Sequence, residues 1–327
     1  MIRRVVLVLS LTLFGLVGIG LGSVLAAELQ PPPAVLVSPD RQERLLPDGA
    51  PRLLETAAEL RLAYAQLDLS AGARLALSRH HVSPINGWQV SVELLEGQLN
   101  GRVEPKRLPY RFVLKAQGGS IELNDPSAFV AYSLPDGDLL FGVLEGSARV
   151  LPNRLEVLTL AERQGVRLTA DGSPTRLDWA VMRATAYRMD GAPLALPLEL
   201  TDSQGITFAF KTGQVIGVPA ETYRLVVQAL LPYKIEGLRV SADQPIPLGF
   251  TFGEMILRDA PQGVTATISS QVTLRLAESE NAWRVSLDDP LIVAPGRWSL
   301  FVQYANNPER RLEATVLVGR RTELTVR

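Results

Sequence analysis

The sequence predicts an all-β protein behind one N-terminal apolar segment, and two observations support this fold class. From Glu59 onward, short runs alternate apolar and polar residues with the period of two of a half-buried strand, and Gly, Pro, Asp or Asn separates the runs. Segments far apart in the chain also repeat one another, which is typical of tandem modules. No stretch of the sequence shows a long, capped pattern with the 3.6-residue period of an amphipathic helix.

The composition excludes several classes of protein. The chain has 327 residues, enough for two or three domains with cores of their own. Its 33 Lys and Arg against 34 Asp and Glu argue against a strongly basic nucleic-acid binder. The absence of cysteine excludes disulfide scaffolds, thiol nucleophiles, cysteine zinc sites and a lipid anchor on an N-terminal cysteine. With only His80 and His81 available for imidazole chemistry, the composition points away from an enzyme.

Residues 1–27 are predicted to form an export segment. Arg3 and Arg4 supply a positive start, and residues 5–27 carry no charge. As a helix, a segment of this length spans roughly 30 Å of hydrocarbon. It is therefore either a cleaved signal peptide or a retained anchor in the inner membrane. Both alternatives place the rest of the chain in the periplasm or at the surface of a bacterial cell, with no regulatory domain ahead of the segment.

Residues 28–50 are predicted to form a stiff linker, because Gln30 is followed by three prolines and then by the polar stretch 38–44. Residues 51–175 follow as the first β domain. The strongest local signal in this domain is the segment 134–138, Leu-Pro-Asp-Gly-Asp. Because Asp-Gly between two alternating runs favours a tight turn, this segment predicts a β-hairpin.

A short motif occurs twice in the first β domain. Leu95-Glu96-Gly97 and Leu144-Glu145-Gly146 lie 49 residues apart, and each follows an apolar strand pattern. Two similar corners explain the repeat, with Gly97 and Gly146 at positive φ. The motif predicts packing and implies no chemistry.

A longer repeat occupies the second half of the chain. Residues 218–228 match residues 293–303 at an offset of 75, so that Tyr223 corresponds to Trp298. Further along, residues 240–248 match residues 316–324 at an offset of 76. The repeat predicts two tandem modules, 176–250 and 251–327, each with the size of a small β-sandwich.

The first β domain resembles the FecR domain of bacterial envelope proteins over about residues 58–172. The resemblance lies in the order and spacing of short patterns, which are Leu67–Leu75, Val92–Gly97, Pro109–Leu114, Phe129–Val143, Leu144–Val150 and Gln164–Val166. The chain departs from the family at residues 126–129, where the family has Gly-Thr. The resemblance implies an envelope module for sensing, binding or assembly. In the best-known members a cytoplasmic N-terminal part relays a signal to a sigma factor. The sequence shows no counterpart of that part, so we do not carry over the sigma-factor role.

Residues 180–327 more loosely resemble carboxypeptidase-regulatory or Cna B-type modules. These families often have Val-Pro-Ala-Gly-x-Tyr before a strand; here Glu221 replaces the Gly, and Trp298 replaces the Tyr in the second copy. The resemblance implies two tandem Ig- or transthyretin-like sandwiches of a spacer or adhesion type. Some relatives carry Lys–Asn cross-links, but the first module has Lys211 and Lys234 without Asn, and the second has Asn without Lys. A cross-link inside either module is therefore excluded.

Candidate binding residues come from the tryptophans and from arginine pairs. The four tryptophans (88, 179, 283 and 298) fit either sandwich cores or a sugar-binding platform. Trp88 is predicted to lie in the loop 83–88 and is the best candidate for exposure, because Pro84 and the Asn86-Gly87 pair mark a turn beside it. Arg310 and Arg311 add a basic edge, although Glu309 and Glu313 beside them also fit an ordinary solvated face. We expect the binding surface among Trp88, Asn86, Arg310 and Arg311.

No cofactor, metal or catalytic residue is predicted. Asp136 and Asp138 fit a hairpin turn better than a calcium loop, and adjacent histidines on a strand point to opposite faces. The leading hypothesis is a non-catalytic exported envelope protein that binds an envelope protein or polymer, not nucleic acid, and contacts membrane only through an uncleaved N-terminal segment. A structural or adhesive stalk is the alternative, followed by a glycan-active enzyme, since a carboxylate pair can be hidden in any sequence.

Overall fold

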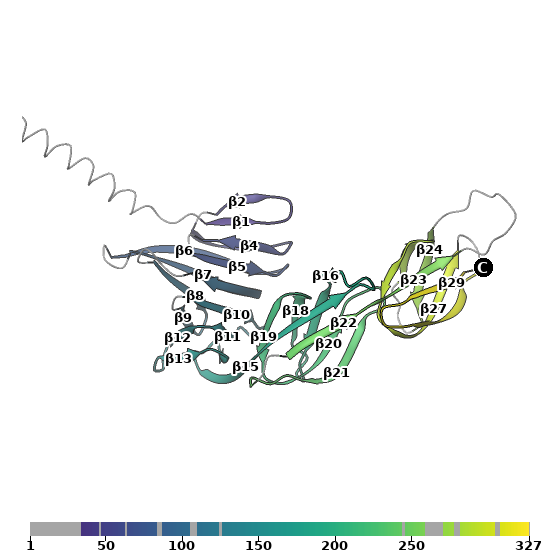
Figure 1. The fold of residues 1–327 in the computed structure, drawn as a ribbon. Helices are drawn as coiled ribbons and strands as arrows, with labels where there is room; N and C mark the ends of the chain where they lie inside the picture. Colours follow the sequence, from purple (N-terminus) through teal and green to yellow (C-terminus); the bar gives the residue numbers. More distant parts are fainter. Residues whose placement is uncertain are drawn as a thin grey trace, which may run out of the picture. The chain divides into compact units, whose positions relative to one another are not determined.

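The computed structural model describes two compact units, one ending at Arg176 and the other beginning at Leu177 (Figure 1). The described residues are 34–45, 47–62, 64–83, 87–104, 110–123, 126–243, 246–258, 271–277, 282–304 and 308–326. All regular elements in these ranges are β-strands, which confirms the predicted fold class. In the same ranges no helix is long and apolar enough to cross a bilayer. The predicted export segment, residues 1–27, lies outside the described residues.

The described residues of unit 1 form fourteen strands in two sheets. The strands are β1 (Val35–Val37), β2 (Gln42–Arg44), β3 (Asp48–Leu53), β4 (Ala58–Arg61), β5 (Ala65–Leu69), β6 (Arg74–Ser83), β7 (Gly87–Val103), β8 (Tyr110–Ala116), β9 (Gly119–Leu123), β10 (Ser127–Ser133), β11 (Leu139–Glu145), β12 (Ser147–Pro152), β13 (Leu158–Ala161) and β14 (Gln164–Leu168). The first sheet has the antiparallel order β2-β1-β4-β5-β7-β10-β11-β14. The second has the order β3-β6-β7-β8-β9-β12-β13, in which only β7 and β8 run parallel.

The linker prediction for residues 28–50 is wrong over the part that the structure describes, which begins at residue 34. Strands β1 and β2 and the start of β3 lie there, and β1 pairs with β4 of the first sheet. Leu36 and Leu45 are buried in the core of unit 1, which holds the segment against the domain. The prolines and the polar residues dominate the local composition, whereas the apolar run Val35–Val37 is too short to show a period.

The two sheets of unit 1 are joined at the predicted corners. Strand β7 has 17 residues, of which the range 87–96 pairs in the second sheet and 97–103 pairs in the first. Gly97 lies at this change of sheet with φ 89°. Gly146, with φ 81°, separates β11 of the first sheet from β12 of the second. The repeated Leu-Glu-Gly motif therefore marks the two places where the chain passes from one sheet to the other, and both positive φ values are confirmed.

One hydrophobic core lies between the two sheets. The rings of Phe112, Phe129 and Phe141 follow one another with centroid distances of 5.8 and 5.6 Å, and all three side chains are fully buried. Gly101 makes room for them, because a Cβ at this position would lie 2.2 Å from the Phe129 ring. The predicted hairpin is also confirmed, since β10 and β11 pair across residues 134–138.

Unit 2 contains two modules with the same topology, except that the first has one more short strand, β16 (Pro193–Leu194), which pairs with the end of β15 (Pro174–Tyr187). Besides these two strands, the first module has β17 (Pro197–Thr201), β18 (Thr207–Lys211), β19 (Val215–Pro219), β20 (Thr222–Val227), β21 (Tyr233–Arg239) and β22 (Ile246–Thr251). The second has β23 (Gly253–Arg258), β24 (Gln271–Leu276), β25 (Ala282–Ser286), β26 (Leu291–Val293), β27 (Gly296–Tyr304), β28 (Arg310–Val316) and β29 (Arg321–Thr325). The four-stranded sheets are β18-β17-β20-β21 and β25-β24-β27-β28. The opposing sheets are β19-β15-β22 and β26-β23-β29, each with one parallel pair.

The repeat in sequence corresponds to a repeated contact. The Tyr223 hydroxyl donates to the carbonyl of Pro219 at 2.8 Å, and the Trp298 indole Nε1 donates to the carbonyl of Ala294 at 3.0 Å. The two donor residues lie 75 residues apart in the sequence, and so do the two acceptor residues. In each module a large ring thus enters the fold at the start of a central strand and fastens its own polar atom to the turn before it.

The two modules of unit 2 are tied together at their junction. A single residue, the fully buried Phe252, separates β22 from β23. Leu231, from the loop between β20 and β21, belongs to the core of the second module and is also fully buried. Its carbonyl accepts a hydrogen bond of 2.9 Å from the Ala294 amide, and it forms a parallel bridge with Val293. The first module therefore supplies part of the second module's core.

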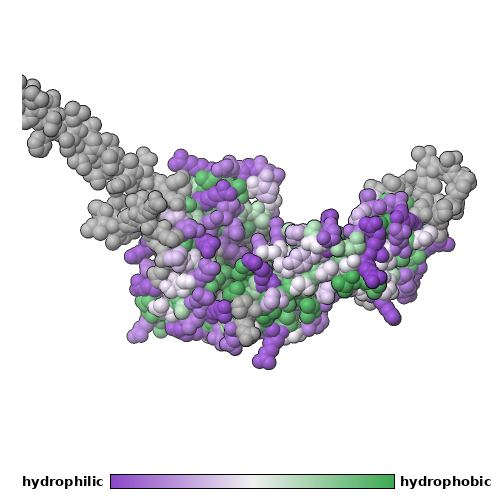
Figure 2. Space-filling view, in the orientation of Figure 1, coloured by the Kyte–Doolittle hydropathy of each residue, from purple (hydrophilic) through white to green (hydrophobic). Residues whose placement is uncertain are grey.

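Polar side chains cover most of the visible surface. Figure 2 shows hydrophilic residues spread over the face in view, with small hydrophobic patches between them. Many of the charges pair across neighbouring strands, as Arg258 does with Glu323 at 2.8 Å. Exposed pairs of this kind add little stability, so the fold depends on its buried apolar side chains.

Gly146→Ala tests the corner geometry. A Cβ at Gly146 would lie 2.4 Å from the carbonyl oxygen of Pro126, whereas a Cβ at Gly72, with a similar φ of 76°, would meet nothing within 4 Å. We expect Gly72→Ala to cost about 1 kcal/mol of unfolding free energy for its backbone alone. Gly146→Ala should cost about 1–3 kcal/mol more because the neighbouring backbone must shift. Urea unfolding of both variants measures the difference, and equal losses would contradict the account of the corner.

Candidate binding site at the module junction

Trp88 lies in strand β7 and not in the loop where the sequence places it. Strand β7 begins at Gly87, and the register sets Trp88 between His81 of β6 and Tyr110 of β8. Its side chain is half-buried. The Asn-Gly pair signals a turn, but the strand starts one residue after Asn86, so the expected loop ends too early to expose the indole fully. Asn86 itself lies outside the described residues.

Arg310 and Arg311 are exposed on β28, as the sequence predicts for a basic edge. The Arg311 guanidinium contacts the carboxylate of Glu313 at 3.0 Å, which agrees with a mixed, solvated face. Trp88 belongs to unit 1, whereas these arginines belong to unit 2. Neither unit therefore brings all the predicted residues into one site, and their role in binding stays a prediction.

The other three tryptophans have different environments. Trp179, in β15, is fully buried in the first module of unit 2. Trp283 of β25 and Trp298 of β27 are half-buried and pack against the core of the second module. These two indoles line the same pocket. The structure thus brings together two tryptophans that are 15 residues apart in the sequence.

The pocket has a volume of about 350 Å³ and lies where the two modules of unit 2 meet. Its lining comes from both modules and consists of Gln228, Ala229, Leu230, Pro232, Lys234, Leu276, Ala277, Trp283, Arg297, Trp298 and Ser299. Small-molecule sites are typically concave, mostly apolar and aromatic, with a few polar groups for orientation. This lining has the concave shape and the aromatic side chains of such a site, but polar atoms make up more than half of its surface, so it is a partly wet site.

Regular structure holds the aromatic walls in place. Trp283 lies opposite Leu274 in the β24–β25 ladder, and Trp298 lies opposite Ala314 in the β27–β28 ladder. The hydrogen bond from Trp298 to Ala294 further limits the orientation of its indole. On the other wall, Leu230 and Pro232 flank Leu231, which the second module's core holds in place. The walls are therefore positioned before any ligand binds.

The described lining of the pocket is positively charged. Its charged side chains are Lys234 and Arg297, and none of the described lining residues is a carboxylate. Within the described part of the chain, neither cation has an ion-pair partner. Glu313 contacts the lining from outside the pocket: its carboxylate accepts a hydrogen bond of 2.9 Å from the hydroxyl of the lining residue Ser299. That hydroxyl and the Arg311 guanidinium lower the pKa of Glu313, and the ion pair with Arg311 offsets its charge.

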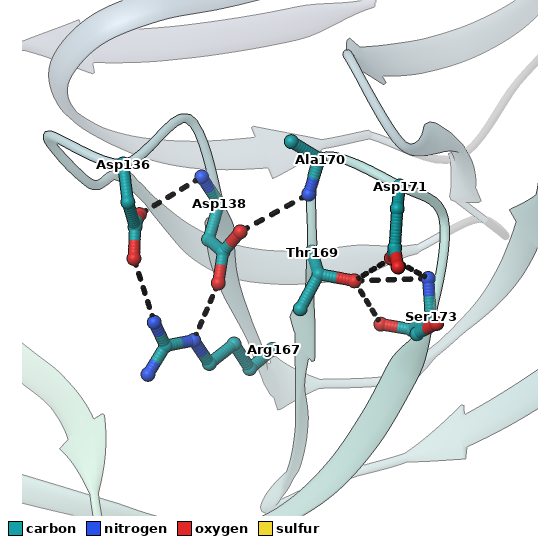
Figure 3. A network of polar contacts seen from close by, with 7 residues as sticks. All are labelled: Asp136, Asp138, Arg167, Thr169, Ala170, Asp171 and Ser173. Atoms are coloured by element: carbon teal, nitrogen blue, oxygen red, sulfur yellow. Dashed lines mark hydrogen bonds and ion pairs between the residues drawn. The ribbon is translucent and has the colours of Figure 1, made fainter.

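The acidic hairpin turn of unit 1 is a closed polar network (Figure 3). Arg167 bridges both carboxylates, at 2.8 Å to Asp136 and 2.7 Å to Asp138. The second oxygen of Asp138 accepts the amide of Ala170 at 3.0 Å. Asp138 is buried, and its hydrogen bond is the largest cause of the raised pKa of Arg167. The oxygens are occupied by protein donors, as a structural turn requires.

The neighbouring turn in Figure 3 is equally self-contained. Asp171 accepts hydrogen bonds from the Thr169 hydroxyl and from the Ser173 amide, the latter at 3.0 Å. The Thr169 bond is the largest cause of the lowered pKa of Asp171. Over the described residues, no group of three or more His, Asp or Glu side chains is arranged to hold a metal ion.

A second pocket lies at the opposite end of the β20–β21 hairpin. It has a volume of about 480 Å³ and is lined mainly by short polar side chains, with Asp178, Glu221 and Asp243 as its acids and Arg239 as its cation. Burial raises the pKa of the Glu221 carboxyl, and the charge of Asp202 adds to the rise. Because it has no aromatic wall, we regard the junction pocket as the better candidate for recognition.

Comparisons with known proteins do not assign the chain to a family. No family model and no curated protein matches it. Two solved structures described as a proposed anti-sigma factor from Parabacteroides distasonis match 39% and 40% of this chain, at 14% identity and TM-scores of 0.33 and 0.30. The chain spans 59% and 56% of their lengths. The TIE protein of Bacillus anthracis matches 90% of this chain and 66% of its own length, at 10% identity and a TM-score of 0.20. The FecR resemblance therefore stays a prediction.

Sequence reasoning missed the junction pocket. The repeat correctly aligns Trp298 with Tyr223, but alternation along a strand does not show that Leu231 leaves its own module. Without that loop, Trp283 and Trp298 look like ordinary core residues. One signal in the sequence could have indicated the pocket. The turn that follows Gln228 in the first module is apolar (Ala229, Leu230, Leu231), which is unusual for an exposed turn.

Glu221→Gln tests the electrostatics of the acidic pocket. The folded-state pKa of Glu221 lies above its ordinary value of 4.5, so ionisation disfavours the folded state at neutral pH. We expect the substitution to raise the free energy of unfolding near pH 7. The gain should vanish as the pH falls from the folded-state pKa through 4.5. Urea unfolding at neutral and acidic pH measures this, with Glu236→Gln on β21 as the control. A gain that persists below the ordinary pKa would contradict the prediction.

Proposed function

We propose that this chain is a non-catalytic, exported protein of the bacterial cell envelope that binds an envelope polymer. The observation that carries the proposal is the junction pocket, in which residues of two modules converge around Trp283 and Trp298. Tryptophan combines a large apolar face with a polar edge, and it is therefore well suited to partly wet recognition sites. A polymer with a repeating unit offers many identical ligands, each of which can occupy the pocket.

The export pattern of residues 1–27 and the FecR-like pattern of unit 1 support the location in the envelope. Both are inferences from sequence, and they agree with each other. A cysteine-free chain with near-balanced charge suits an oxidising compartment and a surface without strong nucleic-acid affinity. In this proposal unit 1 is the sensing or assembly module, and unit 2 supplies the polymer site.

The chemistry of the pocket supports binding over catalysis. A glycoside hydrolase needs two carboxyl groups that flank the bond to be cleaved, about 5–10 Å apart. Among the described residues that line the junction pocket, none is a carboxylate. Imidazole catalysis would have to use His80 or His81, and both belong to strand β6 of unit 1.

A structural or adhesive stalk is the second candidate function. The shared topology of the two modules and the insertion of Leu231 favour it, because a rigid tandem of sandwiches makes an effective spacer. The two functions differ in what the pocket does. A stalk needs the Leu231 contact for stiffness but makes no use of the exposed edges of the indoles.

Cosedimentation with purified envelope polymers tests the binding function. We expect the protein to sediment with the insoluble polymer fraction of the producing cells. Trp283→Ala should raise the apparent Kd about tenfold or more, as for aromatic anchors of other interfaces. Trp88→Ala changes a half-buried tryptophan of unit 1 and is the matched comparison, since it leaves sedimentation unchanged if the junction pocket is the binding site. If Trp88→Ala abolished binding and Trp283→Ala did not, the site predicted from sequence would be the right one.

N-terminal sequencing of the fractionated protein tests export. We expect the material outside the cytosol to begin near Ala27 if the segment is cleaved, or at Met1 if it is an anchor. Recovery of the whole population from the cytosol would overturn the location, and with it the proposed class of partner.

A further inference from the structure

The junction pocket combines an aromatic surface with unpaired positive charge, and this combination restricts the chemistry of its ligand. Two indoles offer flat apolar faces, while Lys234 and Arg297 supply cations at the rim, where both residues are exposed. We propose that the pocket binds an acidic saccharide, with a sugar ring against Trp283 and Trp298 and its carboxylate paired with Lys234 or Arg297. This inference rests on the proposed function and names the class of polymer.

The apolar part of the lining suits a sugar ring. The C–H face of a pyranose is apolar, and its rim carries hydroxyl groups. A sugar ring stacked on an indole therefore buries its C–H face, while its hydroxyl groups bind water or polar side chains nearby. Gln228 and Ser299 also line the pocket and provide such neighbours. A volume of about 350 Å³ lies at the small end of the range for ligand sites, which suits one or two sugar units of a longer chain.

The charge selects an anionic ligand. Lys234 and Arg297 are the charged residues of the described lining, so a carboxylate on the ligand would meet two cations there without a competing acid among the described lining residues. The same charge disfavours a quaternary ammonium ligand, which also binds between aromatic rings but needs a neutral or acidic surrounding. Arginine and lysine hold carboxylates through charge-assisted hydrogen bonds, which are stronger than neutral ones.

A single-stranded nucleic acid is the main rival, because bases also stack on aromatic rings beside cations. Such proteins track the backbone with an extended basic groove. In this chain the formal net charge is −1, and the charges on the outer face of the β25-β24-β27-β28 sheet alternate in sign, as in the pairs Arg275–Glu309 and Arg311–Glu313. The observations therefore favour the saccharide.

Calorimetric titration of the intact protein with short oligogalacturonates tests the proposal, with their methyl esters as ligands that keep the ring and lose the charge. We expect the acid to bind and the ester to bind about tenfold more weakly or not at all. Salt should weaken binding of the acid more than that of the ester. A single-stranded oligonucleotide that binds more tightly than the acid would overturn the proposal.

Two pairs of variants with equal charge change locate the site. Lys234→Gln with Arg297→Gln should weaken binding of the acid about tenfold or more, because charge-assisted hydrogen bonds are lost. Lys211→Gln with Arg284→Gln removes two other exposed cations of unit 2 and should leave binding unchanged. All four side chains are exposed, so folding is not at risk. If both double variants lost the same affinity for the acid, the effect would come from net charge alone, and the proposed site would be refuted.

Failure of this inference is distinguishable from failure of the proposed function. If no oligogalacturonate binds but cosedimentation with envelope polymers still depends on Trp283, the pocket binds a polymer of another class. If cosedimentation is also independent of Trp283, the binding function of the pocket is wrong.

Discussion

The insertion of Leu231 into the second module's core is the contact on which unit 2 depends. It joins two sandwiches that share a topology but no sheet, and it does so with one buried side chain and one backbone hydrogen bond. Burial of a leucine contributes about 1.5–3 kcal/mol, enough to hold a loop in one place. Leu230 and Pro232 are held beside it, and the junction pocket is the space they leave against the two indoles.

Unit 1 depends on a different constraint, which is the passage of the chain between two sheets. At Gly97 and Gly146 the backbone takes a positive φ while neighbouring atoms come too close for a side chain. These corners let one core, with Phe112, Phe129 and Phe141 at its centre, fill the space between the sheets.

Local patterns account for what the sequence predicts well. Alternation predicts strands, Asp-Gly predicts the hairpin at residue 137, and internal repetition predicts both the corners and the tandem modules. Long-range placement accounts for what it misses. The short strand at residues 35–37 exists because Leu36 reaches the core of unit 1, and the pocket exists because Leu231 leaves its own module. The spacing of neighbouring residues in the sequence does not predict where either leucine is buried.

Amide hydrogen exchange at Ala294 tests the junction most directly, since this amide donates to the carbonyl of Leu231 at 2.9 Å. Measured by NMR on the intact protein, it should exchange as slowly as the amide of Leu300 in the centre of β27, and more slowly still with oligogalacturonate bound. Exchange at the rate of an exposed loop amide, while Leu300 stays protected, would show that the two modules are not joined and would contradict the shared pocket.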